Sequence, residues 1–385
     1  VNVTARPDTE WVTRTPSTPT TFTQAFTYAL DPTAAQASAM LSHVGGSRFA
    51  YNALLGLVKD NWDGNRAKKE AGLEVTKNDW VSTSHFGLLY LWAEKRDELA
   101  PWWAENGSST YNDTARRLAA SFTNFRKGRS KFLHFKRRGQ SGSVRLMGPA
   151  VRLDDSHHVR ISRIGEVKTY ESTRKLYRHL ERGTGRIVAA TLRHRNGKWQ
   201  VSFTAEVTRQ LPATRTPERI IGVDLGITTL YTGATPDAKQ VLEVDNPHHL
   251  VKAQRSLAHA QRVASRRQGP KKGVAPSNRW CRANTRVQQV HAHVANARKD
   301  QIHQVTTRLA KDYDVIVVEN LNVKGMVKNH SLAKHISDAA WAEFTRQLDY
   351  KTRWYGSTLV KADRFYPSSK TLQSLRDSQS HTVPW

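Results

Sequence analysis

The chain has 385 residues, of which 60 are Lys or Arg and 33 are Asp or Glu, so its formal net charge at pH 7 is +27. Hydrophobic residues make up 38% of the sequence, which excludes a disordered chain, and the positive charge favours a polyanionic partner, above all nucleic acid. The single cysteine, Cys281, excludes internal disulfides and cysteine-based zinc sites. The lack of a leader or a membrane-length apolar run predicts a cytoplasmic protein without a membrane partner.

The first half of the chain predicts a strand, a helical insertion and a small sheet. Residues 1–21 are rich in Thr, Pro and Ser and are expected to form a loose tail, followed by a strand over 22–32. Apolar residues recur at three- and four-residue spacing over 33–128, which predicts a helical bundle. Residues 129–212 alternate apolar and polar positions around Asn196-Gly197, a typical hairpin turn, so we expect an antiparallel sheet or barrel there.

Basic residues are concentrated where the predicted bundle meets the predicted sheet. Over 126–138 they alternate with Phe132, His134 and Phe135, which favours phosphate contact with nearby base stacking over a merely solvated face. A second basic stretch lies at 262–286. The residues of these two stretches that we expect to contact nucleic acid are Arg126, Lys127, Arg129, Lys131, Lys136, Arg137, Arg138, Arg266, Arg267, Lys271 and Lys272.

The second half, from residue 213 to 371, predicts a mixed α/β domain. Three strands fit residues 219–246, and a long amphipathic helix fits 286–311. A buried strand ending at Glu319, a helix over 337–355 and a strand over 358–365 follow. Three antiparallel strands, then helix, strand, helix and strand, is the order of the RNase H fold. The whole chain is therefore predicted to be a multidomain α+β protein.

Two carboxylates end apolar strands in this half. Asp224 follows Ile220-Ile221-Gly222-Val223, and Glu319 follows Val315-Ile316-Val317-Val318. A carboxylate that ends a buried strand is costly unless a metal, a hydrogen-bond network or chemistry uses it. Divalent ions prefer hard oxygen ligands, so we predict that Asp224 and Glu319 form a catalytic divalent-ion site, with Asp224 bridging two ions and Glu319 binding one.

Each carboxylate alone has an equally good ordinary interpretation, because Asp224 could be a turn residue and Glu319 a cap. The pair is more informative, since both strands are predicted to be neighbours. Three other acidic residues are weaker rivals as metal ligands. Asp245 lies beside a turn, Asp338 opens a predicted helix where capping suffices, and Asp363 lies within the last predicted strand.

The residues around Glu319 resemble a known family. The run VIVVENLNVKGM at 315–326 is similar to the second RuvC motif of TnpB (OrfB) proteins, which insertion sequences encode and which are related to type V CRISPR effectors. The resemblance continues over 328–341 and 365–371, covers Asp224 within 222–227, and extends more weakly to 47–52 and 135–138. It implies a wedge barrel with an inserted helical recognition bundle, followed by an RNase H-like RuvC domain. It also implies a transposon-derived guide RNA and Mg²⁺-dependent cutting of matched double-stranded DNA.

The sequence departs from the family after Thr371. In the family, cysteine pairs of a zinc ribbon and a late Asp follow, whereas residues 372–385 contain neither. We therefore expect the zinc ligands, the third RuvC carboxylate and the last helix to be absent, residues 372–385 to be a non-family tail such as a frameshift produces, and cutting to be impaired. The alternative is a nuclease-dead RNA-guided DNA-binding repressor, although the retained Asp224 and Glu319 favour a nuclease.

Overall fold

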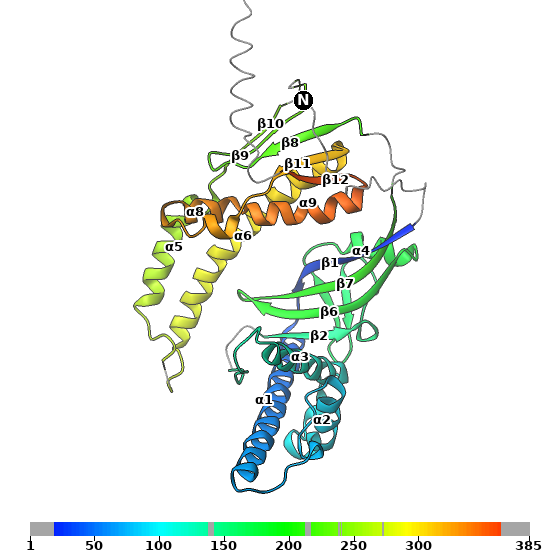
Figure 1. Ribbon diagram of the computed structural model, residues 1–385, viewed down its shortest axis with the longest axis vertical. Helices are drawn as coiled ribbons and strands as arrows, with labels where there is room; N and C mark the ends of the chain where they lie inside the picture. Colours follow the sequence, from blue (N-terminus) through cyan, green and yellow to red (C-terminus); the bar gives the residue numbers. More distant parts are fainter. Residues whose placement is uncertain are drawn as a thin grey trace, which may run out of the picture. The chain divides into compact units, whose positions relative to one another are not determined.

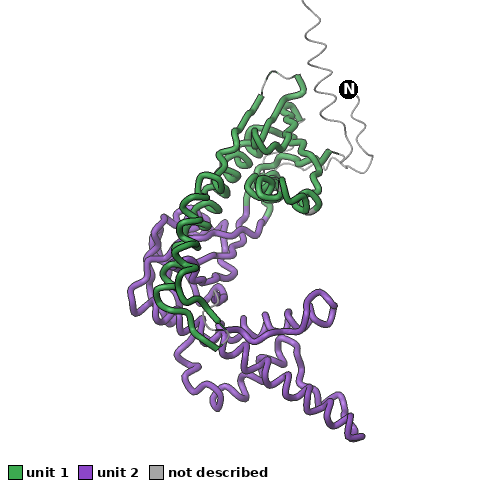
Figure 2. Tube along the Cα trace, turned by 90° about the vertical axis from the view of Figure 1, so that its left-hand side faces the viewer, with its two compact units in different colours: residues 1–20, 209–385 green, residues 21–208 purple. Residues whose placement is uncertain are grey.

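The computed structural model describes residues 19–137, 142–211, 217–237, 239, 241–271 and 273–362. Within this part, the chain divides into two compact units, which Figure 2 draws in different colours. Unit 2 is Thr21–Thr208, and the described residues from Arg209 onward belong to unit 1. None of the described helices combines the length and the apolarity that crossing a membrane requires.

Unit 2 is built on a seven-stranded sheet in the order β2-β6-β7-β1-β5-β4-β3 (Figure 1). β6 and β7 pair antiparallel through the predicted hairpin, where Asn196 and Gly197 have φ of 56° and 77°, as a two-residue hairpin turn requires. Side chains from all seven strands, Phe203 and Val144 among them, form one apolar core. The strands are β1 (Pro19–Asp31), β2 (Ser143–Met147), β3 (Val151–Leu153), β4 (His158–Ile161), β5 (Gly165–Thr169), β6 (Gly185–Arg195) and β7 (Lys198–Gln210), with helix α4 (Arg174–Glu181) before β6.

Three helices are inserted between β1 and β2, namely α1 (Ala34–Glu70), α2 (His85–Leu99) and α3 (Ser108–Arg126). α1 begins at a capping box, in which the Thr33 hydroxyl accepts the Gln36 N–H and the Gln36 side chain accepts the Thr33 N–H. The three helices share a core of their own that includes Leu54, Leu88 and Phe122. The start of β1 corrects one expectation, because residues 19–21, predicted as tail, belong to the first strand, while residues 1–18 lie outside the described part.

Unit 1 is built on a five-stranded sheet in the order β10-β9-β8-β11-β12 (Figure 1). β8, β9 and β10 pair antiparallel, whereas β11 runs parallel to both β8 and β12. The element order predicted from the sequence is therefore present. The elements are β8 (Ile220–Asp224), β9 (Thr229–Ala234), β10 (Val241–Asp245), α5 (His249–Ser265), α6 (Asn278–Asp312), β11 (Val315–Glu319), α7 (Val323–Met326), α8 (His330–Ala339), α9 (Trp341–Tyr355) and β12 (Thr358–Ala362).

The core of unit 1 joins the sheet to α6 and α9. Its centre is a stack of Tyr231 from β9 on Phe344 from α9, with ring centroids 4.2 Å apart, and both side chains are fully buried. Ile302 of α6 and Ile316 of β11 belong to the same core. This packing holds the central strands against two long helices and fixes the position of their ends.

Two helices of unit 1 differ from the sequence prediction. α5 was not predicted, because its buried residues, Ala260 and Ala264, are too small to give a strong apolar stripe. The single helix expected over 337–355 is instead two helices that meet at Ala340. Ala340 has a φ of 53°, a left-handed conformation that ends α8 and redirects the chain into α9.

Candidate functional site

Asp224 and Glu319 are the last residues of two neighbouring strands. β8 and β11 run parallel with Val223 beside Val318, and the next residues of the two strands are Asp224 and Glu319. Neighbouring strands of a sheet lie about 4.8 Å apart, and the carboxyl ends of parallel strands share one edge. The predicted adjacency of the two strand ends is therefore confirmed.

The two carboxylates lie on the face of the sheet opposite to that of Val223 and Val318, whose side chains enter the core. In β8, Ile221 and Val223 are buried while Asp224 is exposed, and in β11 Glu319 follows the buried Val318 and is half-buried. One oxygen of Asp224, Oδ1, accepts the N–H of Leu225 at 2.9 Å. The argument from the cost of burial consequently does not apply to Asp224, and its placement at the strand end is the stronger reason to consider it functional.

A cleft of about 580 Å³ opens at this edge of the sheet and includes Glu319. Ligands of α/β sheets usually bind outside the carboxyl ends of parallel strands, which is where this cleft lies. Its walls come from the segments after β8 and β11, from β12 and from one side of α9. The lining residues are Leu225, Glu319, Asn320, Leu321, Asn322, Val323, Trp341, Ala342, Thr345, Arg346, Asp349 and Lys361.

Arg346 is a cation held in a fixed position on the cleft. Its Nε donates to Glu343 Oε2 at 2.8 Å and its Nη2 donates to Glu343 Oε1 at 2.6 Å, so the two side chains form a bidentate pair within α9. The hydrogen bonds from Arg346 lower the pKa of the Glu343 carboxyl and keep it ionised. Together with Lys361, Arg346 places positive charge where the cleft would receive a phosphate.

The three acidic rivals have different surroundings. Asp245 is the exposed last residue of β10, and Asp363 lies outside the described residues. Asp338 does not open a helix, as the sequence suggested, but lies in the last turn of α8. Its carboxylate pairs with Arg298 and accepts the N–H of Leu250 in the first turn of α5, so it joins three helices and is already engaged.

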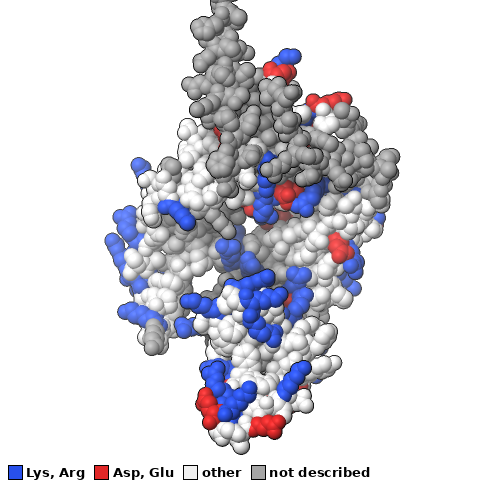
Figure 3. Space-filling view, viewed as in Figure 1, with Lys and Arg blue, Asp and Glu red and all other residues white. Residues whose placement is uncertain are grey.

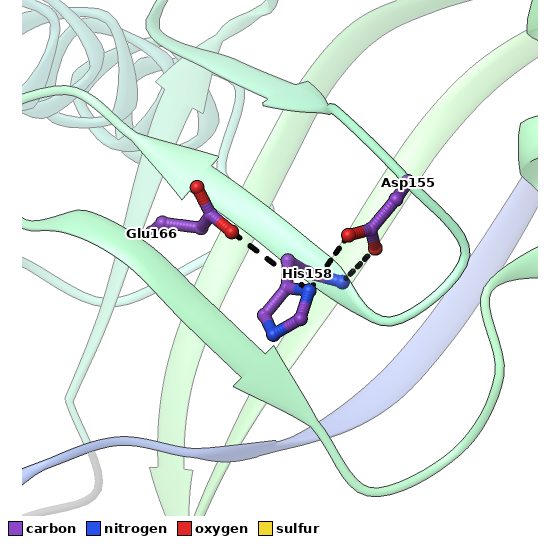
Figure 4. Close-up of side chains that lie close together, drawn as sticks. All are labelled: Asp155, His158 and Glu166. Carbon is purple, nitrogen blue, oxygen red and sulfur yellow. Dashed lines mark hydrogen bonds and ion pairs between the residues drawn. The ribbon is translucent and has the colours of Figure 1, made fainter.

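Within the described part of the chain, one group of three possible metal ligands has its ligand atoms within 4.8 Å of one another, and it lies in unit 2 (Figure 4). Asp155 precedes β4, His158 begins it, and Glu166 lies on β5. Asp155 Oδ1 accepts the N–H groups of His157 and His158, and Oδ2 lies 2.7 Å from His158 Nδ1. Glu166 accepts a hydrogen bond from Arg160 at 3.1 Å. These contacts are those of a capped turn and a cross-strand ion pair.

Asp224 and Glu319 have the donor chemistry that Mg²⁺ prefers, because both offer carboxylate oxygens at a solvent-accessible edge. Asp349 is the other acidic side chain on the cleft, and its carboxylate pairs with Arg353 one turn further along α9. Among the described residues, no third carboxylate forms a compact ligand group with Asp224 and Glu319. The chemistry of these two carboxylates suits a divalent ion, and any further ligands would have to come from outside the described residues, from water or from the substrate.

The predicted nucleic-acid contacts lie mainly in connections and at helix ends. Arg126 ends α3, and the exposed Lys127, Arg129 and Lys131 follow it, whereas Lys136 is half-buried beside the exposed Arg137. Figure 3 shows Lys and Arg side chains gathered over the α3 and β2 region of unit 2. In unit 1, the segment between α5 and α6 carries the exposed residues Arg266, Arg267 and Lys271. Arg138 and Lys272 lie outside the described residues.

The expected base-stacking side chains are not equivalent. Phe132 packs on Phe125 and Trp62, with ring centroids 5.2 and 6.2 Å apart, so it belongs to the helical bundle. Phe135 is 51% exposed and keeps a ring face available. Base stacking stays a prediction for Phe132, which is half-buried, as it does for Phe135 and His134.

Sequence reasoning missed Arg346, Arg48 and Arg117. Arg346 reaches the cleft from a helix of which only the apolar face was considered. Arg48 and Arg117 line a second cavity, together with Lys136. Arg48, Arg117 and Lys136 are distant from one another in sequence. The only local pattern among them is the four-residue spacing of Asp113 and Arg117 on one helix, which is typical of an ion pair.

Comparison with known families gives three matches along the chain. The family model described as "Probable transposase" (OrfB/IS605) matches residues 201–330, and a Cas12f1-like TNB domain matches residues 341–382. The latter match runs past Thr371, where we expected family-like sequence to end. A helix-turn-helix domain of the same family matches residues 22–67, a range in which the structure has strand β1 and the single continuous helix α1.

Individual proteins are similar over nearly the whole chain. A "Putative RNA-guided DNA endonuclease" from Mycobacterium tuberculosis is 33% identical over 380 residues, covering 92% of this chain and 80% of the relative. A protein of the same name from Streptomyces pristinaespiralis is 33% identical over 349 residues, covering 90% and 79%. InsQ of Escherichia coli K12, with the same designation, is 28% identical over 365 residues, covering 90% and 82%.

Among solved structures, a Cas12f1–sgRNA–target DNA complex aligns over 89% of both chains with a TM-score of 0.47 and 9% identity, a likeness too low to carry an argument. The sequence relationships are much stronger. Because a relative that is 33% identical spans 92% of this chain, and the family model matches both β8 and β11, the chain belongs to the TnpB (OrfB) family.

Proposed function

We propose that this protein is an RNA-guided DNA endonuclease that binds a transposon-derived guide RNA and cuts double-stranded DNA matched to it. The observation that carries the proposal is the pair Asp224 and Glu319 at adjacent parallel strand ends beside the cleft. The names of the relatives support the same activity. In this proposal unit 1 is a RuvC-like nuclease domain, and the sheet of unit 2 is a wedge barrel that carries the recognition helices.

The residues at the cleft have two roles in this proposal, metal binding and binding of the DNA backbone. Asp224 and Glu319 would hold Mg²⁺ through carboxylate oxygens. The chemistry that such ions supply when bound is activation of water and stabilisation of charge on the scissile phosphate. Arg346 and Lys361 would bind the DNA backbone in the cleft, and Glu343 orients Arg346 through its two hydrogen bonds. Positioning of this kind accounts for much of catalysis in phosphoryl transfer.

Guide-dependent cleavage tests the proposal. The protein is co-expressed with the DNA that flanks its gene, the co-purifying RNA is sequenced, and a duplex matched to that RNA is incubated with the complex and Mg²⁺. We expect cutting by the wild type and a loss of about 1,000-fold or more in Asp224→Asn and Glu319→Gln, since metal ions supply several kcal/mol of transition-state stabilisation. RNA binding should be unchanged, because neither carboxylate contacts the guide in this proposal.

Asp237→Asn is the matched control. Asp237 is exposed in the β9–β10 turn, at the opposite end of β9 from the catalytic edge, and it loses the same charge. Cutting by Asp224→Asn at the rate of Asp237→Asn would contradict the proposal. The same assay measures the weak cutting that we predict for these 385 residues. Guide-dependent DNA binding without any cutting would favour the repressor instead.

A further inference from the structure

A second cavity, of about 260 Å³, lies within unit 2 and is lined almost entirely by cations and hydroxyl groups. Its residues come from α1, α3, the connection after α3 and the start of β2. None of the lining residues is acidic. The lining residues are Val44, Ser47, Arg48, Arg117, Lys136, Arg137, Gly142 and Ser143.

Arg117 is fixed in the wall of this cavity. Its Nη2 donates to Ser47 Oγ at 3.2 Å and to the carbonyl of Ser143 at 3.3 Å. Ser47 in turn contacts the Thr114 hydroxyl at 2.8 Å, and Thr114 donates to the Thr110 carbonyl. The Ser47 hydroxyl must therefore donate to Thr114, which leaves its lone pair for Arg117. A hydroxyl that is used in this way positions the guanidinium and holds it rigid.

The only counter-charge that the described residues give Arg117 is Asp113, whose carboxylate is 1% exposed and lies 2.9 Å from Arg117 Nε. Asp113 is shared with Arg116, which also contacts it. One buried carboxylate therefore serves two guanidinium groups, and Arg48, Lys136 and Arg137 add further positive charge at the cavity. The cavity has an excess of cations that an anion from outside the chain would neutralise.

Lys136 is equally well anchored. Its N–H donates to Asn52 Oδ1 at 2.8 Å, and Asn52 Nδ2 donates to the Lys136 carbonyl at 2.9 Å, so one side chain of α1 holds the backbone on both sides. The ammonium lies 3.8 Å from the centroid of the Tyr51 ring. Burial and the neighbouring Arg117 lower the pKa of Lys136 to about 8, as expected for a cation without a direct anionic partner.

The backbone completes the enclosure at Gly142. A Cβ atom on Gly142 would lie 2.1 Å from Cγ1 of Val44, so only glycine lets the chain entering β2 approach α1 this closely. This close approach brings Ser143, whose carbonyl binds Arg117, into the wall of the cavity. The cavity is therefore a built feature of the fold and not a chance gathering of long surface side chains.

We propose that this cavity binds a single backbone phosphate of a nucleic-acid strand through Arg48, Arg117, Lys136 and Arg137. Arginine and lysine donors surrounding a small space fit a tetrahedral oxyanion. The cavity is smaller than the roughly 300–1,000 Å³ of typical small-molecule sites and has no aromatic wall, so it does not suit a base or a metabolite. The inference rests on the proposed function only in taking nucleic acid as the ligand.

Salt-dependent binding by the full-length protein freed of nucleic acid tests this site. A fluorescent oligothymidylate and a labelled RNA homopolymer are titrated over a series of KCl concentrations. We expect Lys136→Gln and Arg48→Gln each to weaken binding about tenfold and to reduce the slope of log K against log salt by about 1, because each removes one phosphate contact.

Lys59→Gln is the matched control. Lys59 is exposed on the same helix as Arg48, outside the cavity, and carries the same charge. It should change affinity by less than about twofold. Equal behaviour of Lys136→Gln, Arg48→Gln and Lys59→Gln would overturn the proposal. This titration measures binding alone, so a failure of cutting remains distinguishable from a failure of this site.

A second measurement needs no variant and so does not depend on whether a variant folds. The wild type is treated with a limiting amount of an amine-acylating reagent, and the labelling of Lys136 is followed by mass spectrometry. Nucleic acid should reduce labelling of Lys136 at least about fivefold more than labelling of Lys59. Equal protection by inorganic phosphate at the same ionic strength would reveal a site for free phosphate and overturn the commitment to nucleic acid. Absence of protection by either would overturn the site itself.

Discussion

Two groups of potential metal ligands among the described residues differ in where the fold places them. Asp155, His158 and Glu166 are close together (Figure 4), but Asp155 caps a turn, both carboxylates contact His158, and Glu166 pairs with Arg160. Asp224 and Glu319 instead end two parallel strands beside a cleft. Closeness of ligand atoms alone is therefore a poorer guide to chemistry than position at the carboxyl edge of a sheet.

The largest expected effect tests how the proposed catalytic edge of unit 1 is supported. Phe344→Ala removes a fully buried ring that stacks on Tyr231 beneath the sheet of unit 1, and we expect it to lower the free energy of unfolding by about 3–5 kcal/mol. Chemical denaturation followed by tryptophan fluorescence measures the change. The control Phe135→Ala, at a side chain 51% exposed, should cost about 0.5 kcal/mol or less. Equal costs would show that the edge does not depend on this core.

A smaller effect is expected at the unit 2 group. Asp155→Ala removes the acceptor of the His157 and His158 N–H groups and should lower stability by about 1 kcal/mol without changing the rate of DNA cutting. Thermal unfolding and the cleavage assay measure the two quantities. A large loss of cutting with normal stability would reverse our comparison and make this group the functional one.

The Asp155 carboxylate should make the stability of the wild type depend measurably on pH. Hydrogen bonds from His157 and His158 lower the pKa of Asp155 below its unfolded value of 3.8. The stabilisation is therefore fully present above that pH and is lost as the pH falls through the folded pKa. As the pH falls from about 5 to about 2, the difference in free energy of unfolding between the wild type and Asp155→Ala should disappear. A gap that stays constant would contradict the capping role.

Lys351, at the support of unit 1, gives a pH dependence of the same sign in a higher pH range. Its ammonium is buried between α6 and α9, where it donates to the His303 carbonyl and to the hydroxyls of Thr306 and Thr307. Burial lowers its pKa from 10.5 to about 8. Since the unfolded chain then binds more protons between these values, this group adds stability as the pH rises from about 8 to 10.5. Lys351→Met should lack that rise, as denaturation at several pH values would show.

The smallest effect is expected at Tyr231, whose hydroxyl is buried without a hydrogen-bond partner among the described residues. Burial raises the pKa of this hydroxyl. Tyr231→Phe removes an unsatisfied polar group and keeps the stack on Phe344, so it should leave stability unchanged or raise it by up to about 1 kcal/mol. Thermal unfolding of the variant measures this, and a loss above 1 kcal/mol would point to a partner for the hydroxyl.

Sequence patterns predicted the features that depend on local periodicity. The apolar strands that end at Asp224 and Glu319 and the Asn196-Gly197 hairpin carry their signals within a few residues. Helix α5 gave no signal, because its buried residues are alanines, which are too small to form a strong apolar stripe. The break at Ala340 was equally hidden, since neither Gly nor Pro marks it.

The strand-end carboxylates of unit 1 were easier to predict from the sequence than the cationic cavity of unit 2, because their signals are local. Asp224 and Glu319 each end a recognisable strand, so fold order alone brought them together. Arg48, Arg117 and Lys136 come from a helix, another helix and a connection, and only tertiary packing through Asn52 and Ser47 gathers them. Long-range packing of this kind leaves no periodic trace in a single sequence.

Direct binding of Mn²⁺, a paramagnetic substitute for Mg²⁺, tests the central claim that Asp224 and Glu319 form the metal site. Electron paramagnetic resonance of the full chain during a Mn²⁺ titration reports free ion and therefore binding. We predict binding by the wild type and by His158→Ala, and its loss in Asp224→Asn and in Glu319→Gln. Binding that survives both carboxylate substitutions but disappears in His158→Ala would place the metal in unit 2 and contradict the account.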